Sequence, residues 1–159
     1  MESPPRAVVL GLGNDLLGDD GIGLIVAREV RRRAPPGVEV VESGEAGLAL
    51  IELLMGYQVA VIVDAIRTGA PPGTLHRLDR GAFDRILAPS AHYAGLAEVF
   101  DLAERLRLPM PSHLAVVAVE VEDPYSFAEH PTASVADAVV PAAEMVLREL
   151  EGALSPALA

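Results

Sequence analysis

The 159-residue sequence contains no cysteine and no lysine, and each absence removes a set of chemistries. Without cysteine the chain has no thiolate nucleophile, no disulfide, and no cysteine ligand for zinc or an iron–sulfur cluster. Without lysine it lacks the lysine of a Walker-type phosphate loop and any lysine for Schiff-base or general-base chemistry. All 12 basic residues are therefore arginine. Catalysis must come from Asp, Glu, His, Ser, Thr, Tyr or Arg, or from a metal ion supplied by another molecule.

The chain is also poor in positive charge, and it has no long apolar runs. The chain has 23 acidic residues against 12 basic ones, a net charge of −11, which disfavours nucleic acid and acidic lipid surfaces as partners. The sequence contains no unbroken stretch of 18 apolar residues, the length that a membrane-spanning helix needs. The first residues lack the pattern of a targeting segment. We therefore expect a cytoplasmic protein that has neither a nucleic-acid nor a membrane partner.

The length fits one domain over residues 1–159, with residues 1–5 and 152–159 expected to be frayed. Apolar periodicity alternates between strand-like and helix-like segments along the chain. Strands are predicted at 6–12, 38–42, 58–64, 74–78 and 113–121, and helices at 21–33, 47–55, 94–106 and 134–150. The alternation predicts a three-layer α/β/α sandwich with a twisted, mainly parallel sheet of about five strands, in which the polar strand 74–78 lies near an edge.

Polar residues gather where ligands bind in such sheets, beyond the carboxyl ends of the strands. Asp19 and Asp20 follow the first strand, Asp64 ends the third, and His92 lies in the loop 89–93. Two carboxylates and one imidazole make an incomplete shell for a divalent metal and leave positions open for a substrate. The same residues have plainer interpretations, because either aspartate after the first strand can cap a helix, Asp64 can cap a turn, and His92 can be an ordinary loop residue.

The first glycine-rich turn also has a dinucleotide-binding interpretation. Gly11 and Gly13 give the start of a G-x-G-x-x-G motif, but Leu16 stands where the third glycine is expected. Asp19 and Asp20 would repel a pyrophosphate there, whereas Glu42 at the end of the second strand could hold a ribose. Nucleotide binding therefore stays open as an alternative.

Three motifs in the chain together resemble one family. Residues 11–23 match G-x-G-N-x-L-x-x-D-[DE]-x-x-G, residues 61–65 form a strand ending in D-A that is followed by Pro-Gly-Thr at 72–74, and residues 90–96 match S-x-H-x-x-G-L. In order and spacing these motifs resemble the hydrogenase maturation proteases, endopeptidases that trim the large subunit of nickel–iron hydrogenases. The resemblance covers nearly the whole chain.

The resemblance implies a site and a partner. Asp20, Asp64 and His92 take the positions that contact metal in the family, and Asp20 or Asp64 would be the catalytic base. Nickel would be supplied by the substrate and bound only transiently, the substrate being a nickel-loaded large-subunit precursor that loses a C-terminal extension. A non-catalytic nickel-sensing or docking chaperone for the same subunit is the alternative.

Further loop residues are candidates for contact with the substrate. They are Asn14, Asp19, Gly44 and Gly47. The segment 42–47 resembles a family loop of the form D-G-G-x-x-G, with Glu42 for the aspartate and Ser43 for a glycine. Asp20 itself stands where some family members carry glutamate, and its shorter side chain changes the reach of the carboxylate.

Overall fold

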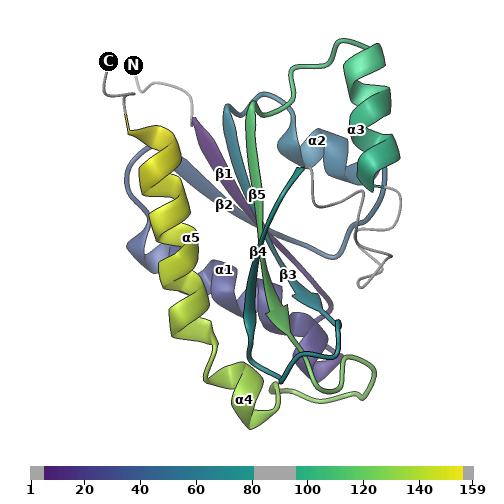
Figure 1. The fold of residues 1–159 in the computed structure, drawn as a ribbon, viewed down its shortest axis with the longest axis vertical. Helices are drawn as coiled ribbons and strands as arrows, with labels where there is room; N and C mark the ends of the chain where they lie inside the picture. The colour runs from purple at the N-terminus through teal and green to yellow at the C-terminus, as the bar shows by residue number, and fades with distance from the viewer. Residues whose placement is uncertain (1–5, 81–95, 156–159) are drawn as a thin grey trace.

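The computed structural model describes residues 6–80 and 96–155, which form one five-stranded sheet and the helices packed on it (Figure 1). The strands are β1 (Ala7–Leu12), β2 (Val38–Ser43), β3 (Val59–Ile66), β4 (Leu75–Asp79) and β5 (His113–Glu120). The helices are the short 3-10 helix η1 (Gly18–Gly21), α1 (Ile22–Arg33), α2 (Ala49–Leu54), α3 (Leu96–Arg105), α4 (Ala133–Ala136) and α5 (Val139–Leu154). All five predicted strands are present.

The strand order in the sheet is β2-β1-β3-β5-β4. The pairs β1–β2, β1–β3 and β3–β5 are parallel, and β4 joins the edge of the sheet antiparallel to β5. The prediction of a mainly parallel sheet of about five strands is confirmed, as is the edge position of the strand at 75–79. Because β1, β3 and β5 run in the same direction, the loops that leave them meet at one end of the sheet.

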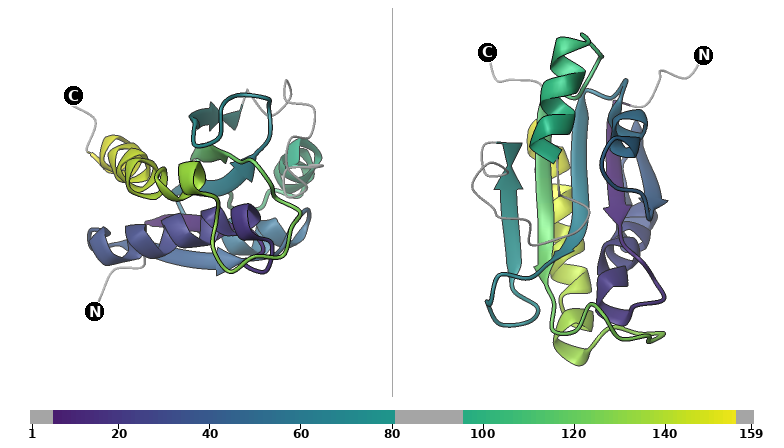
Figure 2. Two further views of the ribbon diagram at one scale, coloured as in Figure 1. Left: turned by 90° about the horizontal axis from the view of Figure 1, so that it is seen from below. Right: turned by 90° about the vertical axis from the view of Figure 1, so that its right-hand side faces the viewer.

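The two faces of the sheet are covered by different helices (Figures 1 and 2). Alternate residues of a strand point to opposite faces, and the buried residues of the central strands divide accordingly into two apolar clusters. Val9, Val61 and Val117 pack with residues of α1 and α5. Leu10 and Ile62 pack instead with residues of α2 and α3. The continuous apolar runs in β1, β3 and β5 are what two covered faces require.

The prediction of one continuous helix at 134–150 is wrong, because the chain forms two helices there. The short α4 ends at Ala136, and α5 begins at Val139. Pro141 explains the break, since in a continuous helix its ring would clash with the carbonyl group four residues earlier, at Asp137. In the first turn of a new helix the missing N–H of proline costs nothing.

The end of α5 also differs from the expected frayed tail. The helix continues through Gly152 to Leu154, and Leu150 is buried against the sheet. Residues 1–5 and 156–159, the rest of the segments expected to be frayed, lie outside the described residues. Within the described ranges, no helix combines the length and apolar character needed to cross a bilayer.

Candidate functional site

Asp64 lies inside the sheet at the carboxyl end of the parallel strands. It is a β3 residue in register with Ala118 of β5, and its side chain is fully buried. On the other side of β3, the last register pair with β1 joins Gly11 to Val63, so the chain leaves β1 beside Asp64. One carboxylate oxygen of Asp64 accepts a hydrogen bond from the Ala65 N–H at 2.7 Å. The strand predicted to end at Asp64 continues to Ile66, so this carboxylate interrupts a buried apolar run two residues before the end of β3, near the end of the sheet where parallel sheets bind ligands.

The turn that follows β1 places Asp20 at the same carboxyl end of the strands as Asp64. Asp20 belongs to η1, and its Oδ2 accepts a hydrogen bond from the Asn14 N–H at 3.1 Å. The prediction that Asp19 or Asp20 caps α1 is wrong, because the residue at the cap position is Gly21 and no side chain bonds to the cap. The structure thus places the two predicted aspartates of the metal site after β1 and at the end of β3, which are neighbouring strands.

The turn after β1 and the start of α1 pack closely against the ends of β1 and β3. Gly13 and Gly23, two glycines of the motif at residues 11–23, make this packing possible. A Cβ atom on Gly23 would overlap the carbonyl oxygens of Leu12 and Val63, at the ends of β1 and β3. A Cβ atom on Gly13 would overlap the carbonyl oxygen of Asp20. The two glycines that suggested a nucleotide site are needed for packing as well, because a Cβ atom on Gly11 would overlap the Gly23 carbonyl oxygen and the Ala27 side chain.

Asp19 is buried and bound by backbone N–H groups, whereas its neighbour Asp20 is partly exposed. The Asp19 side chain is 1% exposed, and its carboxylate accepts hydrogen bonds from the N–H groups of Glu122, Asp123 and Thr132 at 2.6–3.0 Å. The Thr132 hydroxyl group donates to it as well. Asp19, predicted as a substrate-loop residue, thus fastens the loop after β5 to the turn after β1.

The other predicted loop residues lie around a small cavity or outside it. The cavity has a volume of about 370 Å³ and lies beyond the ends of β1 and β2. Its lining residues are Gly13, Asn14, Asp15, Leu24, Arg28, Glu42, Ser43 and Gly44. Asn14 accepts a hydrogen bond from the Leu16 N–H through its Oδ1, at 3.0 Å. Gly47 is not among the lining residues, and its positive φ of 61° is a backbone conformation that favours glycine.

Glu42 is paired with arginine in this cavity. Arg28 and Arg31 donate to its two carboxylate oxygens at 2.8 and 2.9 Å. Burial alone raises the pKa of Glu42, but the hydrogen bonds from the two guanidinium groups outweigh it and lower the pKa on balance. The carboxylate that a ribose would need is already bound by α1, which weakens the nucleotide alternative.

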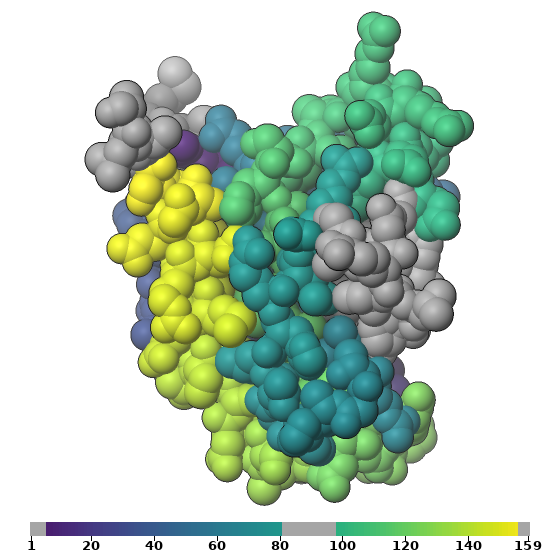
Figure 3. Space-filling view, in the orientation of Figure 1, coloured from purple at the N-terminus to yellow at the C-terminus, as the bar shows by residue number. Residues whose placement is uncertain are grey.

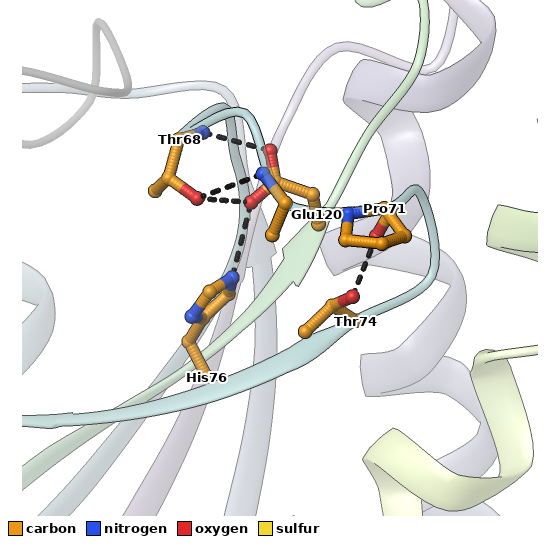
Figure 4. A network of polar contacts seen from close by, with 6 residues as sticks. Thr68, Pro71, Thr74, His76 and Glu120 are labelled. Atoms are coloured by element: carbon orange, nitrogen blue, oxygen red, sulfur yellow. Dashed lines mark hydrogen bonds and ion pairs between the residues drawn. The ribbon is translucent and has the colours of Figure 1, made fainter.

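Sequence reasoning missed a buried carboxylate at the end of β5 (Figure 4). Glu120 is 1% exposed and accepts hydrogen bonds from the Thr68 N–H at 2.7 Å and the Thr68 hydroxyl group at 2.5 Å. Its Oε1 also contacts the His76 Nε2 at 3.0 Å. Burial raises the pKa of Glu120, and the hydrogen bonds from Thr68 and His76 lower it by more. An apolar strand ending in a carboxylate, the signal that singled out Asp64, would also have found Glu120.

Glu120 and His76 lie on the same face of the sheet as Asp64. Ala118 of β5 is in register with both Asp64 of β3 and His76 of β4, so the three side chains share one face. Glu120 is two residues further along β5 and therefore points to that face too. The face around Asp64 is more polar than the sequence alone indicated.

His92, the predicted imidazole ligand, lies outside the described residues, as does the rest of the S-x-H-x-x-G-L motif before Leu96. In residues 6–80 and 96–155, no three His, Asp or Glu side chains form a metal-binding group. The three-residue metal site therefore stays a prediction.

The fold is that of an α/β protein with a mainly parallel sheet, and the candidate residues Asp20 and Asp64 lie at the carboxyl ends of its strands. A family model described as hydrogenase maturation protease matches residues 24–149. The chain therefore belongs to the hydrogenase maturation protease family.

Individual relatives support this assignment. The chain is 34% identical to the hydrogenase 2 maturation protease of Escherichia coli K12, covering 91% of this chain and 90% of that protein. It is 31% identical to the hydrogenase expression/formation protein HupD of Thiocapsa roseopersicina, covering 94% and 70%. Among solved structures, the hydrogenase maturating endopeptidase HybD from E. coli superposes with a TM-score of 0.81 at 29% identity and covers 94% of each chain.

Proposed function

We propose that the protein is an endopeptidase that recognises nickel in the precursor of a nickel–iron hydrogenase large subunit and removes its C-terminal extension. The observation that carries the proposal is the position of Asp20 and Asp64 at the carboxyl ends of neighbouring strands, in a chain of the hydrogenase maturation protease family. The partner is the nickel-loaded precursor. Nickel arrives with this substrate and is not a resident cofactor.

The donor set suits inspection of a metal that another protein holds. Asp20, Asp64 and His92 offer carboxylate oxygens and one imidazole, and the chain has no thiolate. Such a set binds nickel less tightly than a shell that contains thiolates. A substrate that holds nickel through thiolates therefore keeps its ion while the three residues contact it.

The same carboxylates can perform the proton transfers of peptide hydrolysis. A water molecule adds to the carbonyl carbon and gives a proton to Asp20 or Asp64, and the leaving nitrogen takes up a proton as the C–N bond breaks. Asp64 is shielded from solvent, and polar interactions in such a region of low dielectric constant are stronger than in water. The cavity lined by Asn14 and Gly44 gives the extension a place beside this edge.

Incubation of the purified protein with nickel-loaded and nickel-free forms of the same precursor tests the proposal. Intact mass spectrometry should show loss of the C-terminal peptide only from the nickel-loaded form. Binding of that form without any mass loss would instead establish the docking chaperone. Equal cleavage of both forms would refute nickel recognition.

A further inference from the structure

Three large apolar side chains are exposed together at the edge that carries the candidate site. Leu16 is 63% exposed, Tyr125 is 71% exposed and Phe127 is 82% exposed. The chain contains only three Phe, three Tyr and no Trp, so two of its six aromatic side chains project into solvent from one loop. We call Leu16, Tyr125 and Phe127 the apolar platform. Exposed aromatic residues grouped in this way are typical of protein interfaces.

The platform joins the loops that follow the central strands. The Ala128 N–H donates to the Leu16 carbonyl group at 3.1 Å, which holds the loop after β5 against the turn after β1. Arg67, just after β3, lies with its guanidinium carbon 5.5 Å from the centre of the Tyr125 ring. In Figure 3 the loops after β3 and β5, in teal and green, lie together at the lower end of the molecule. All three loops leave the strand ends where Asp20 and Asp64 lie.

Hydrogen bonds fix the loop that carries the aromatic residues. Asp19 binds the N–H groups of Glu122 and Asp123, as described above. Asp123 in turn accepts hydrogen bonds from the N–H groups of Tyr125 and Ser126 at 3.0 and 3.1 Å. The backbone that carries the aromatic side chains is therefore held in place before any partner arrives, which lowers the entropic cost of ordering this loop on binding.

We propose that the apolar platform docks the folded body of the large-subunit precursor while its C-terminal extension enters the site. This inference rests on the proposed function and adds the surface that the substrate occupies. Three exposed acidic residues are near the platform in the chain: Asp15 precedes Leu16, and Glu122 and Glu129 belong to the loop that carries Tyr125 and Phe127. The matching surface of the precursor is therefore an apolar patch bordered by basic side chains, because interfaces pair an apolar core with a complementary charged rim.

Steady-state cleavage of the full precursor by the variant Tyr125→Ala/Phe127→Ala tests the platform. KM should rise roughly tenfold or more, because truncated aromatic anchors dominate interface energies, while kcat at saturation stays unchanged. The control is Leu106→Ala/Val140→Ala, which removes side chains that are 59% and 50% exposed elsewhere on the molecule. The control should leave KM unchanged, and both variants should keep the melting temperature of the wild type.

An unchanged KM in the platform variant, or an equal rise in the control, would overturn the proposal. So would a dimer of this chain that dissociates when Phe127 is replaced, since the platform would then bind a second copy. If the wild type does not cleave the precursor, the proposed function fails, and binding of the nickel-loaded precursor decides the platform separately. Weaker binding by the platform variant alone supports it, and absence of binding by the wild type refutes it.

Discussion

At the scale of single residues, Asp19 and Asp20 are adjacent in the sequence but have different environments. The Asp19 carboxylate is buried and binds backbone N–H groups of the loop after β5. Asp20 is partly exposed and bonds to the Asn14 N–H within its own turn. Asp19 therefore stabilises the loops around the candidate site, and Asp20 remains accessible from solvent.

Replacement of Asp19 should accordingly destabilise the protein. Asp19→Ala leaves the N–H groups of Glu122, Asp123 and Thr132 without their acceptor, and we expect a loss of about 2–4 kcal/mol in the free energy of unfolding. Urea denaturation measures this loss. Asp15→Ala removes an exposed carboxylate from the same turn and should change stability by less than about 0.5 kcal/mol. Equal stability of the two variants would contradict the anchoring role of Asp19.

At the scale of elements, the first turn of α1 approaches the ends of β1 and β3 so closely that only glycine fits at position 23. The close approach brings η1, and with it Asp20, to the strand end that carries Asp64. A glycine in α5 offers the opposite situation, because Gly152 has no atom within 4 Å of the position of an added Cβ.

These two helical glycines give a matched pair of substitutions. Gly23→Ala should destabilise the fold by about 1–3 kcal/mol through overpacking against backbone carbonyl groups. Gly152→Ala should stabilise it by about 0.5–1 kcal/mol, because alanine loses less conformational freedom in a helix. Thermal or urea unfolding of both variants checks the signs. Tolerance of alanine at position 23 would mean that the turn is not held against the strands.

Glu149 connects α5 to two strands through charged hydrogen bonds. Arg77 of β4 donates to both of its carboxylate oxygens at 2.8 Å, and His113 of β5 contacts Oε1 at 2.8 Å. The hydrogen bonds from Arg77 are the main cause that lowers the pKa of Glu149 from 4.5 to about 2. Because the folded-state pKa lies below the unfolded one, ionised Glu149 stabilises the fold above pH 4.5, and this contribution disappears as the pH falls towards 2.

Glu149→Gln should therefore lower the free energy of unfolding by about 1–2 kcal/mol at pH 7. The difference from the wild type should shrink between pH 4.5 and pH 2, where the wild-type carboxylate becomes protonated. Urea unfolding at several pH values measures the effect, and Glu144→Gln on the exposed side of the same helix is the control. A difference that does not change with pH would show that the charge of Glu149 is not its source.

At the scale of the whole molecule, the sequence predicted the five strands well, because they depend on local apolar patterns, but it ended the third strand at Asp64, two residues before the end of β3. The partners of Asp19 could not be predicted, since Thr132 lies 113 residues further along the chain and meets Asp19 only in the folded state. The contact between His76 and Glu120 spans 44 residues and depends on the antiparallel addition of β4. The break before α5 was readable in Pro141, whose local effect the helical periodicity concealed.

The parallel order of β1, β3 and β5 is what unites the site. It brings together the turn with Asp20, the strand end with Asp64 and the loops that carry the apolar platform. One edge of the sheet therefore combines the proposed carboxylates with a surface suited to a protein substrate. This arrangement agrees with a peptidase that acts on one folded partner.

The proposed role of the Asp64 carboxylate is best tested by the mass of a nickel-loaded large-subunit precursor after incubation with Asp64→Asn. This variant keeps the shape of the side chain and removes its charge, and Asp101→Asn on the exposed surface of α3 is the matched control. We expect the wild type and the control to remove the C-terminal peptide, and folded Asp64→Asn to do so at least roughly a hundredfold more slowly. Cleavage by folded Asp64→Asn at the wild-type rate would contradict this role.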